Sequence, residues 1–273
     1  MQLSNNKLSG QIPTEIGSLL QLTSLDLSSN YAVSGPIPDE FRFLRELTYL
    51  DLHLNNLDGN DISQLGNLKR LTYLDLGWNN LIYPIPSELG LLTRLTDLYL
   101  NDNAFSGTIP SDFGRLIHVK NLALWNNKLS GTIPTEFGNF HEVEALDMDR
   151  NLLSGKIPCE LGALKNLQNL RLEYNKLDGT IPSELGGLAN LTQLSLQYNK
   201  LLGTIPSELG KLASVNFVWL FSNYLNGTIP SELGNISSLT DLSLNSNALS
   251  GTIPSELGNL SQLQYLWLYN NYL

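Results

Sequence analysis

The chain has 273 residues, of which 42% are hydrophobic and 15% are charged. Acidic residues outnumber basic ones 26 to 16, so the net charge of −10 disfavours binding to nucleic acid phosphates. No apolar run approaches the roughly 18 residues of a membrane span, and the chain does not open with the pattern of a secretory signal peptide. With one cysteine, Cys159, and 3 histidines, we expect no internal disulfide, no catalytic residues, no metal site and no cofactor.

The pattern Leu-x-x-Leu-x-Leu-x-x-Asn-x-Leu recurs along the whole chain. Its asparagine returns every 24 residues, with one step of 25 between Asn30 and Asn55. The twelve positions are Asn6, Asn30, Asn55, Asn79, Asn103, Asn127, Asn151, Asn175, Asn199, Asn223, Asn247 and Asn271. This period predicts one leucine-rich repeat solenoid over residues 1–273, with a partial N-terminal repeat followed by eleven complete strands.

The first half of each repeat is predicted to be a short strand. In Leu22–Leu27, alternation places Leu25 and Leu27 inward and Ser24 and Asp26 outward. Equivalent strands stacked about 4.8 Å apart form a parallel sheet. The repeat asparagine is expected to satisfy backbone groups of neighbouring coils that would otherwise be buried without partners.

The second half is most regular in Gly251–Gly258, which reads Gly-Thr-Ile-Pro-Ser-Glu-Leu-Gly. Ile-Pro occurs ten times and predicts an extended segment that leads into a short helical turn. The glutamate is expected to meet unpaired backbone N–H groups in the first turn. Twenty of the 22 glycines occupy two repeat positions, where we expect a positive φ or close packing.

Irregular repeats cluster between residues 31 and 84, which favours either a binding surface in the early coils or recent duplication of the late ones. Neither end shows a capping module, so the coil edges at Leu3 and Leu273 are expected to be exposed.

The half-repeat Leu-x-Gly-x-Ile-Pro-x-Glu-Leu-Gly-x-Leu resembles the plant-specific class of leucine-rich repeats. That class includes receptor-like kinase ectodomains, receptor-like proteins and polygalacturonase-inhibiting proteins, and similar arrays occur in algae and other protists. The resemblance covers the whole chain. It implies an α/β fold: a right-handed solenoid with a concave parallel sheet and short 3-10 or helical turns on the convex side. It also implies an extracellular or secreted protein that binds ligands without catalysis.

Function in a solenoid is expected at strand positions that face solvent on the concave side. These positions carry all four tryptophans and many other aromatic residues. The predicted ligand-binding residues are Tyr73, Trp78, Tyr99, Trp125, Arg171, Tyr174, Phe217, Trp219, Phe221, Tyr265, Trp267 and Tyr269. Such residues often dominate binding energy, although aromatic residues could instead cover the open end of the array.

The same face is predicted to be acidic. Its acidic patch consists of Asp26, Asp51, Asp75, Asp147 and Asp149. Asp26, Asp51 and Asp75 share one strand position in adjacent coils, so they should raise one another's pKa or recruit a cation or a basic ligand group. The alternative is a solvated scaffold variant, with His53 beside it as an ordinary surface residue.

Two other features permit a function without indicating one. Four sequons, at Asn190, Asn226, Asn235 and Asn259, permit glycosylation, but chance predicts a similar number. A broken threonine column beside Ile-Pro, from Thr108 to Thr252, leaves ice binding open, which a thermal-hysteresis assay would test.

The sequence therefore favours a non-enzymatic module that binds a protein or peptide on its concave face, outside the cell. The alternatives are binding to carbohydrate or cell wall, or inhibition of a wall-degrading enzyme. A third is a structural adaptor that self-associates through its ends.

Overall fold

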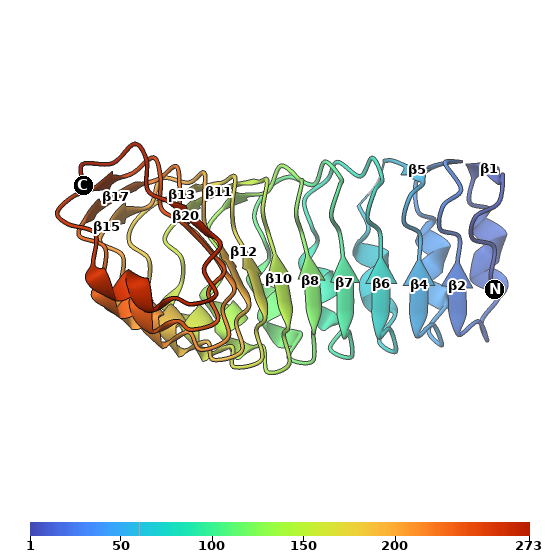
Figure 1. Cartoon of the computed structure of the whole chain (residues 1–273). Helices are drawn as coiled ribbons and strands as arrows, with labels where there is room; N and C mark the ends of the chain where they lie inside the picture. Colours follow the sequence, from blue (N-terminus) through green and yellow to red (C-terminus); the bar gives the residue numbers. More distant parts are fainter. Residues whose placement is uncertain (60) are drawn as a thin grey trace. The chain divides into compact units, whose positions relative to one another are not determined.

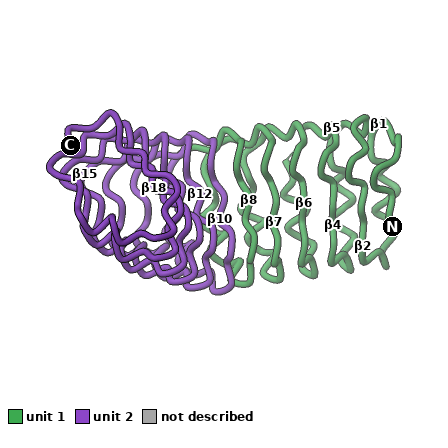
Figure 2. The backbone as a smooth tube through the Cα atoms, in the orientation of Figure 1, with its two compact units in different colours: residues 1–130 green, residues 131–273 purple. Residues whose placement is uncertain are grey.

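The computed structural model describes residues 1–59 and 61–273. The chain divides into two compact units, residues 1–130 and 131–273 (Figure 2). Both units are built from the same repeat: a short strand, a turn at the repeat asparagine, an extended segment and a 3-10 turn. The predicted solenoid of parallel strands and short turns is confirmed. That residues 1–273 form a single domain stays a prediction.

The main strands are three residues long and pair in parallel within each unit (Figure 1). In unit 1 they are β2 (Ser24–Asp26), β4 (Tyr49–Asp51), β6 (Tyr73–Asp75), β7 (Asp97–Tyr99) and β8 (Asn121–Ala123). In unit 2 they are β10 (Ala145–Asp147), β12 (Asn169–Arg171), β14 (Gln193–Ser195), β16 (Phe217–Trp219), β18 (Asp241–Ser243) and β20 (Tyr265–Trp267). Pairing advances by one repeat per strand, as in Leu50 with Leu74, so equivalent side chains form columns.

The extended segments form shorter parallel ladders. Their strands are β1 (Ser9–Gln11), β3 (Ala32–Gly35), β5 (Asn56–Leu57), β9 (Ser130–Gly131), β11 (Leu152–Gly155), β13 (Lys176–Leu177), β15 (Leu202–Gly203), β17 (Tyr224–Gly227) and β19 (Ala248–Leu249). The repeat leucines of each unit, such as Leu25 and Leu194, are completely buried between the main strands and the 3-10 turns. Of the two predicted exposed edges, Leu273 is exposed, whereas Leu3 is half-buried in a segment whose backbone bonds to the next coil through Leu3 N–H and Asp26 O.

The helical elements are five-residue 3-10 turns. They are η1 (Thr14–Ser18), η2 (Asp39–Phe43), η3 (Ser63–Asn67), η4 (Ser87–Leu91), η5 (Ser111–Arg115), η6 (Thr135–Asn139), η7 (Cys159–Ala163), η8 (Ser183–Gly187), η9 (Ser207–Lys211), η10 (Ser231–Asn235) and η11 (Ser255–Asn259). Over residues 1–59 and 61–273, no helix is long and apolar enough to cross a membrane.

The turn glutamates lie in the first turn, as predicted, but they do not cap it by hydrogen bonds to backbone N–H groups. Proline precedes most of the turns, and none of the described turns has a side-chain hydrogen bond at its N-cap. The carboxylate instead accepts from the hydroxyl beside it, as Glu184 does from Ser183 at 3.3 Å. The backbone of each turn forms 3-10 bonds, such as Leu185 N–H to Pro182 O and Leu188 N–H to Leu185 O.

The repeat asparagine joins neighbouring coils, as predicted. Asn79 Nδ2 donates to Leu76 O of its own coil at 3.1 Å and to Leu52 O of the preceding coil at 3.0 Å. Its Oδ1 accepts from Leu57 N–H at 3.0 Å. One amide thus satisfies backbone groups on two coils, which requires both its donor and its acceptor.

Replacing Asn127 with Leu is expected to unfold its region locally. Asn127 donates to Leu100 O and Leu124 O and accepts from Phe105 N–H. Its loss leaves these backbone groups without hydrogen bonds, and each costs about 1–3 kcal/mol of folding stability. Because coils couple to their neighbours, amide exchange should accelerate most around Phe105 and Asn127. The exposed Lys128→Leu variant is the control. Equal protection in both variants would refute the structural role of Asn127.

The two glycine columns have different physical reasons. In one, the backbone is left-handed, as at Gly251 with a φ of +88°. In the other, the next coil leaves no room for a side chain: a Cβ at Gly210 would lie 2.3 Å from Glu232 O. Both reasons anticipated from the sequence are therefore present.

Gly210→Ala is expected to destabilise the protein, because backbone atoms of the next coil must shift to admit the methyl group. We expect a cost of about 1–3 kcal/mol in denaturant unfolding. Gly258→Ala is the matched control, since a Cβ at this equivalent position has nothing within 4 Å. Similar stability for the two variants would contradict the steric explanation.

Candidate ligand-binding surface

Outward-pointing side chains of the main strands, and of the three residues after them, form a surface that we call the strand face. In β16, Val218 is buried, whereas Phe217 is exposed and Trp219 is half-buried. Because the inward positions are taken by leucine, the strand face holds the polar and aromatic residues that vary between repeats. All of the predicted ligand-binding residues belong to it.

The residue before each repeat asparagine has left-handed backbone. All twelve such residues have φ between +49° and +56°, including Trp78 and Tyr174. This conformation costs roughly 1–2 kcal/mol for a residue with a Cβ, and the hydrogen bonds of the adjacent asparagine hold it in place. It turns large side chains onto the strand face, where Trp78 is 51% exposed.

In unit 1, a cluster of acidic residues is covered by tyrosines. Asp51 is buried, and its oxygens contact His53 Nδ1 at 2.8 Å and the Tyr49 hydroxyl at 3.1 Å. Asp75 accepts from Gly77 N–H at 2.8 Å and from the Tyr73 hydroxyl at 3.3 Å. Ligand atoms of Asp51, His53 and Asp75 lie within 4.8 Å of one another. Because protein groups already form hydrogen bonds with the carboxylates of Asp51 and Asp75, we assign no ligand to this cluster.

The predicted mutual effect of these carboxylates on pKa holds at one position. Burial, together with the charge of Asp51, raises the pKa of Asp75 to about 6. Burial of Asp26 acts in the same direction, but hydrogen bonds from Ser28 outweigh it and lower the pKa of Asp26 overall. The prediction was wrong for Asp26 because Ser28 satisfies its charge.

Aromatic rings of unit 1 contact one another along the columns. Tyr49 and Tyr73 are stacked with centroids 4.5 Å apart, and Tyr99 lies 5.7 Å from Tyr73. Trp78 and Trp125 meet edge to face at 6.0 Å. Tyr73 and Tyr99 are therefore partly covered, and Trp78 is the most exposed of the predicted binding residues in this unit.

The last three main strands of unit 2 carry two aromatic rows. Pairing places Ser243 between Trp219 and Trp267, so these tryptophans are two strands apart in one column. Phe217 lies 5.4 Å from Trp219, and Tyr265 is stacked on Trp267 at 6.4 Å. Between the rows lie the small polar residues of β18. Trp267 is 46% exposed, so this surface keeps a large accessible apolar area.

Between residues 147 and 198, unit 2 places acidic groups around one arginine. Arg171 lies 3.2 Å from Glu173 Oε1 and 3.6 Å from Asp149 Oδ2, and its strand pairs it with Asp147. Asp149 and Glu173 are buried. Burial raises the pKa of Asp147 to about 6, although Arg171 opposes the shift and Asp149 adds to it.

Two residues of this surface, Tyr198 and Gln197, were not predicted from the sequence. Tyr198 stacks on Tyr174 with centroids 4.4 Å apart and contacts Phe221 at 5.2 Å. It precedes Asn199 as Tyr174 precedes Asn175, so the repeat position was the available signal. Gln197 is buried at the position equivalent to Glu173, and only the structure shows that burial.

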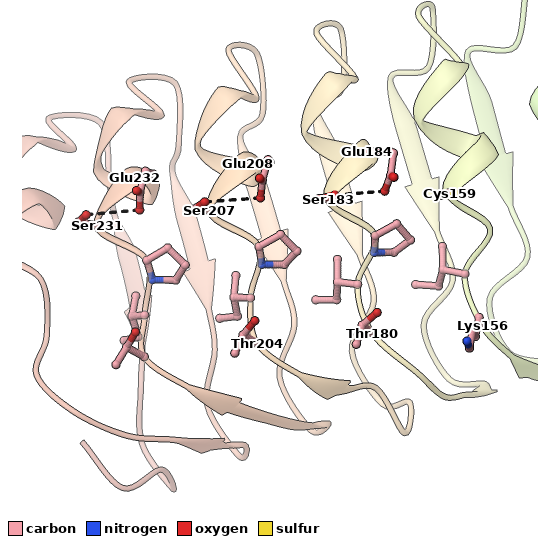
Figure 3. Close-up of a pocket in the computed structure, with 18 of the residues that line it drawn as sticks. Lys156, Cys159, Thr180, Ser183, Glu184, Thr204, Ser207, Glu208, Ser231 and Glu232 are labelled. Atoms are coloured by element: carbon pink, nitrogen blue, oxygen red, sulfur yellow. Dashed lines mark hydrogen bonds between the residues drawn. The ribbon is translucent and has the colours of Figure 1, made fainter.

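A groove of unit 2 lies along the Ile-Pro segments and the 3-10 turns (Figure 3). It encloses about 1670 Å³ and is lined by Thr, Ile, Pro, Ser and Glu of successive coils. The groove repeats the same small set of side chains from coil to coil and contains none of the aromatic residues of the strand face. We therefore place the candidate site on the strand face.

Cys159 and the predicted glycosylation positions lie outside this face and are exposed. Cys159 is exposed at the groove and hydrogen-bonds to Glu160. The four predicted glycosylation positions are exposed: Asn190, Asn226, Asn235 and Asn259.

Comparison with family models gives two matches. A leucine-rich repeat region matches residues 29–181, and a leucine-rich repeat matches residues 1–19, 190–212 and 238–260. No curated protein sequence matches the chain significantly.

Solved structures of plant receptors are similar to this chain. The plant peptide hormone receptor RGFR1 in complex with RGF2 has a TM-score of 0.97 and 40% identity, over 98% of this chain and 43% of the receptor chain. PEPR1 with AtPEP1 has a TM-score of 0.94 and 39% identity, over 98% and 38%. The Arabidopsis HAESA ectodomain with an IDA peptide hormone has a TM-score of 0.93 and 39% identity, over 99% and 45%. This chain thus spans less than half of each receptor chain.

Replacing Asp147 with Asn is expected to stabilise the protein at neutral pH. The pKa of Asp147 is about 6 in the folded chain and about 3.9 in an unfolded one, so the folded state holds the extra proton between these values. The charged carboxylate therefore lowers stability above pH 6, and this effect fades toward pH 4. We expect a gain of about 1–3 kcal/mol at pH 7.5 and a smaller one at pH 5, measured by denaturant unfolding.

Asp26→Asn is the control of opposite sign, because the pKa of Asp26 is lowered and its charge is hydrogen-bonded. It should give no gain at pH 7.5. A destabilised Asp147→Asn protein, or a gain independent of pH, would contradict the assignment.

Proposed function

The chain belongs to the leucine-rich repeat family, with repeats of the plant type, and from this we propose that it is a non-enzymatic recognition module for a peptide or protein ligand. The ligand binds on the strand face, outside the cell. The observation that carries the proposal is the aromatic surface of β16 to β20 in unit 2, where Tyr265, Trp267 and Tyr269 are all about half exposed.

Exposed aromatic area of this kind is costly in water and favours a binding role. The rows flanking β18 pair large rings with the hydrogen-bonding groups of Asp241 and Asn245. Tyrosine and tryptophan dominate the energetics of many protein interfaces, since each buries a large area and loses little side-chain freedom.

The similar receptors support the same class of ligand. RGFR1 is a plant peptide hormone receptor in complex with RGF2, and the HAESA structure is a receptor kinase ectodomain in complex with a peptide hormone. The ectodomain of HAESA supports an extracellular location for this chain.

Carbohydrate or cell-wall binding, including inhibition of a wall-degrading enzyme, is the second candidate. The observation in its favour is the parallel pair of Tyr265 and Trp267, whose planes differ by 4°. Flat exposed rings can also stack on sugars. A glycan array beside a displayed peptide library distinguishes the two ligand classes.

Trp219→Ala is expected to abolish most of the affinity for peptides selected on the native protein from a displayed library. Loss of this central ring should weaken binding by at least about 2 kcal/mol, or roughly 30-fold, in titration calorimetry. Melting temperature should change little, because Trp219 is half-buried and its neighbour Val218 forms the core.

Tyr224→Ala is the matched control, since Tyr224 is an exposed aromatic residue of β17 outside the strand face. Trp267→Ala should also reduce affinity. If Trp267→Ala changes only stability or self-association, measured by light scattering, the aromatic rows serve as a cover or an assembly surface. Full affinity in both tryptophan variants would refute the proposal.

A further inference from the structure

The acidic groups around Arg171 carry more negative charge than their basic neighbours balance. Asp147, Asp149 and Glu173 contribute three carboxylates, and we call these residues with Gln197 the anionic cluster. Arg171 is the central cation. Arg150 lies at the edge of the anionic cluster: its Nε is 3.8 Å from Asp149 Oδ2, and its side chain is 62% exposed.

The cluster also has more hydrogen-bond acceptors than donors. Within residues 1–59 and 61–273, Asp147 Oδ1, Glu173 Oε2 and Gln197 Oε1 are buried and have no hydrogen-bond partner. Glu173 and Gln197 are only 5% and 6% exposed. A buried acceptor without a donor destabilises the folded protein, so a ligand that supplies donors gains binding energy here.

These acceptors come from neighbouring coils. Arg150 N–H donates to Glu173 O and Tyr174 N–H donates to Gln197 O, so the positions of Asp149, Glu173 and Gln197 are consecutive in one column. Asp147 pairs with Arg171 in the adjacent column. The cluster therefore spans three coils about 4.8 Å apart.

An aromatic surface adjoins the anionic cluster. Tyr174 and Tyr198 directly follow Glu173 and Gln197, are stacked at 4.4 Å and are each about 45% exposed. The guanidinium of Arg150 already lies 5.5 Å from the Tyr174 ring centroid. The surface thus accepts a cation and the apolar stem of a long side chain.

We propose that the anionic cluster binds the guanidinium of an arginine side chain of the ligand. The incoming arginine displaces the exposed Arg150 from Asp149, enters beside the half-buried Asp147 and lays its methylene groups on Tyr174 and Tyr198. Local side-chain rotation then exposes the buried oxygens to its donors. This inference rests on the proposed function and names one residue type of its ligand.

Arginine fits these acceptors better than lysine does. A guanidinium directs five N–H donors in a planar fork, so it can serve acceptors on different coils, whereas an ammonium has three donors at one point. It is also more weakly hydrated, which favours its transfer into a half-buried site.

The test is an NMR titration of the full chain with Nα-acetyl-arginine methylamide. The matched probes are the citrulline derivative, which is uncharged and nearly isosteric, and the lysine derivative. We expect saturable shifts at Glu173, Tyr174 and Gln197 with the arginine derivative, and binding at least about tenfold weaker with either of the others. Absence of saturable shifts, or equal binding of the citrulline derivative, would overturn the proposal.

Variants locate the site. Glu173→Gln should weaken arginine binding at least about tenfold, Arg150→Ala should strengthen it by removing the competing guanidinium, and Asp26→Asn in unit 1 should leave it unchanged. If Glu173→Gln does not fold, Asp147→Asn replaces it, since this variant is expected to gain stability while losing affinity. Unchanged arginine binding by the folded variant overturns the proposal.

The outcome is separate from that of the proposed function. If library peptides require Trp219 but the arginine derivative does not bind, recognition on the strand face stands and the arginine site is wrong. If the arginine derivative binds at the cluster but no selected peptide requires the strand-face tryptophans, the site stands and the proposed function is wrong.

Discussion

The hydrogen bonds of the repeat asparagine are the interaction on which the rest of the structure depends. The amide serves carbonyl and N–H groups on two coils, as Asn79 does with Leu76, Leu52 and Leu57, and so fixes the spacing of the strands. It also stabilises the left-handed residue before it, which turns Trp78 and its equivalents outward. The repeat asparagine therefore determines both the spacing of the coils and the direction of the large side chains on the strand face.

The scaffold leaves the strand face free to vary, because leucine, asparagine and glycine satisfy packing and hydrogen bonding at the inward positions. Stacking then brings together residues that are 24 apart in the chain. Carboxylates that would be solvated on an isolated strand become buried between coils, which is why Asp75 and Asp147 have raised pKa values. Columns of aromatic residues arise by the same route.

The two acidic clusters show how neighbours decide the character of a buried charge. In unit 1, the Tyr49 and Tyr73 hydroxyls, His53 and backbone N–H groups reach the carboxylates. In unit 2, Arg171 serves several acids, and oxygens of Asp147, Glu173 and Gln197 lack donors. The carboxylates of the first cluster have hydrogen-bond donors within the protein, whereas the second cluster has acceptor oxygens that a cationic group of a ligand can contact.

The repeat, the parallel strands, the asparagine bonds and the columns of Trp219 and Trp267 could be predicted from residue order, because a fixed period makes each position repeat its environment. How much of each column is buried, and which groups meet across it, follows instead from the packing of neighbouring coils. Ser28 reverses the expected pKa shift of Asp26, the turn glutamates take no capping role, and Gln197 is buried. These outcomes depend on side-chain packing between coils, which residue type and spacing do not specify.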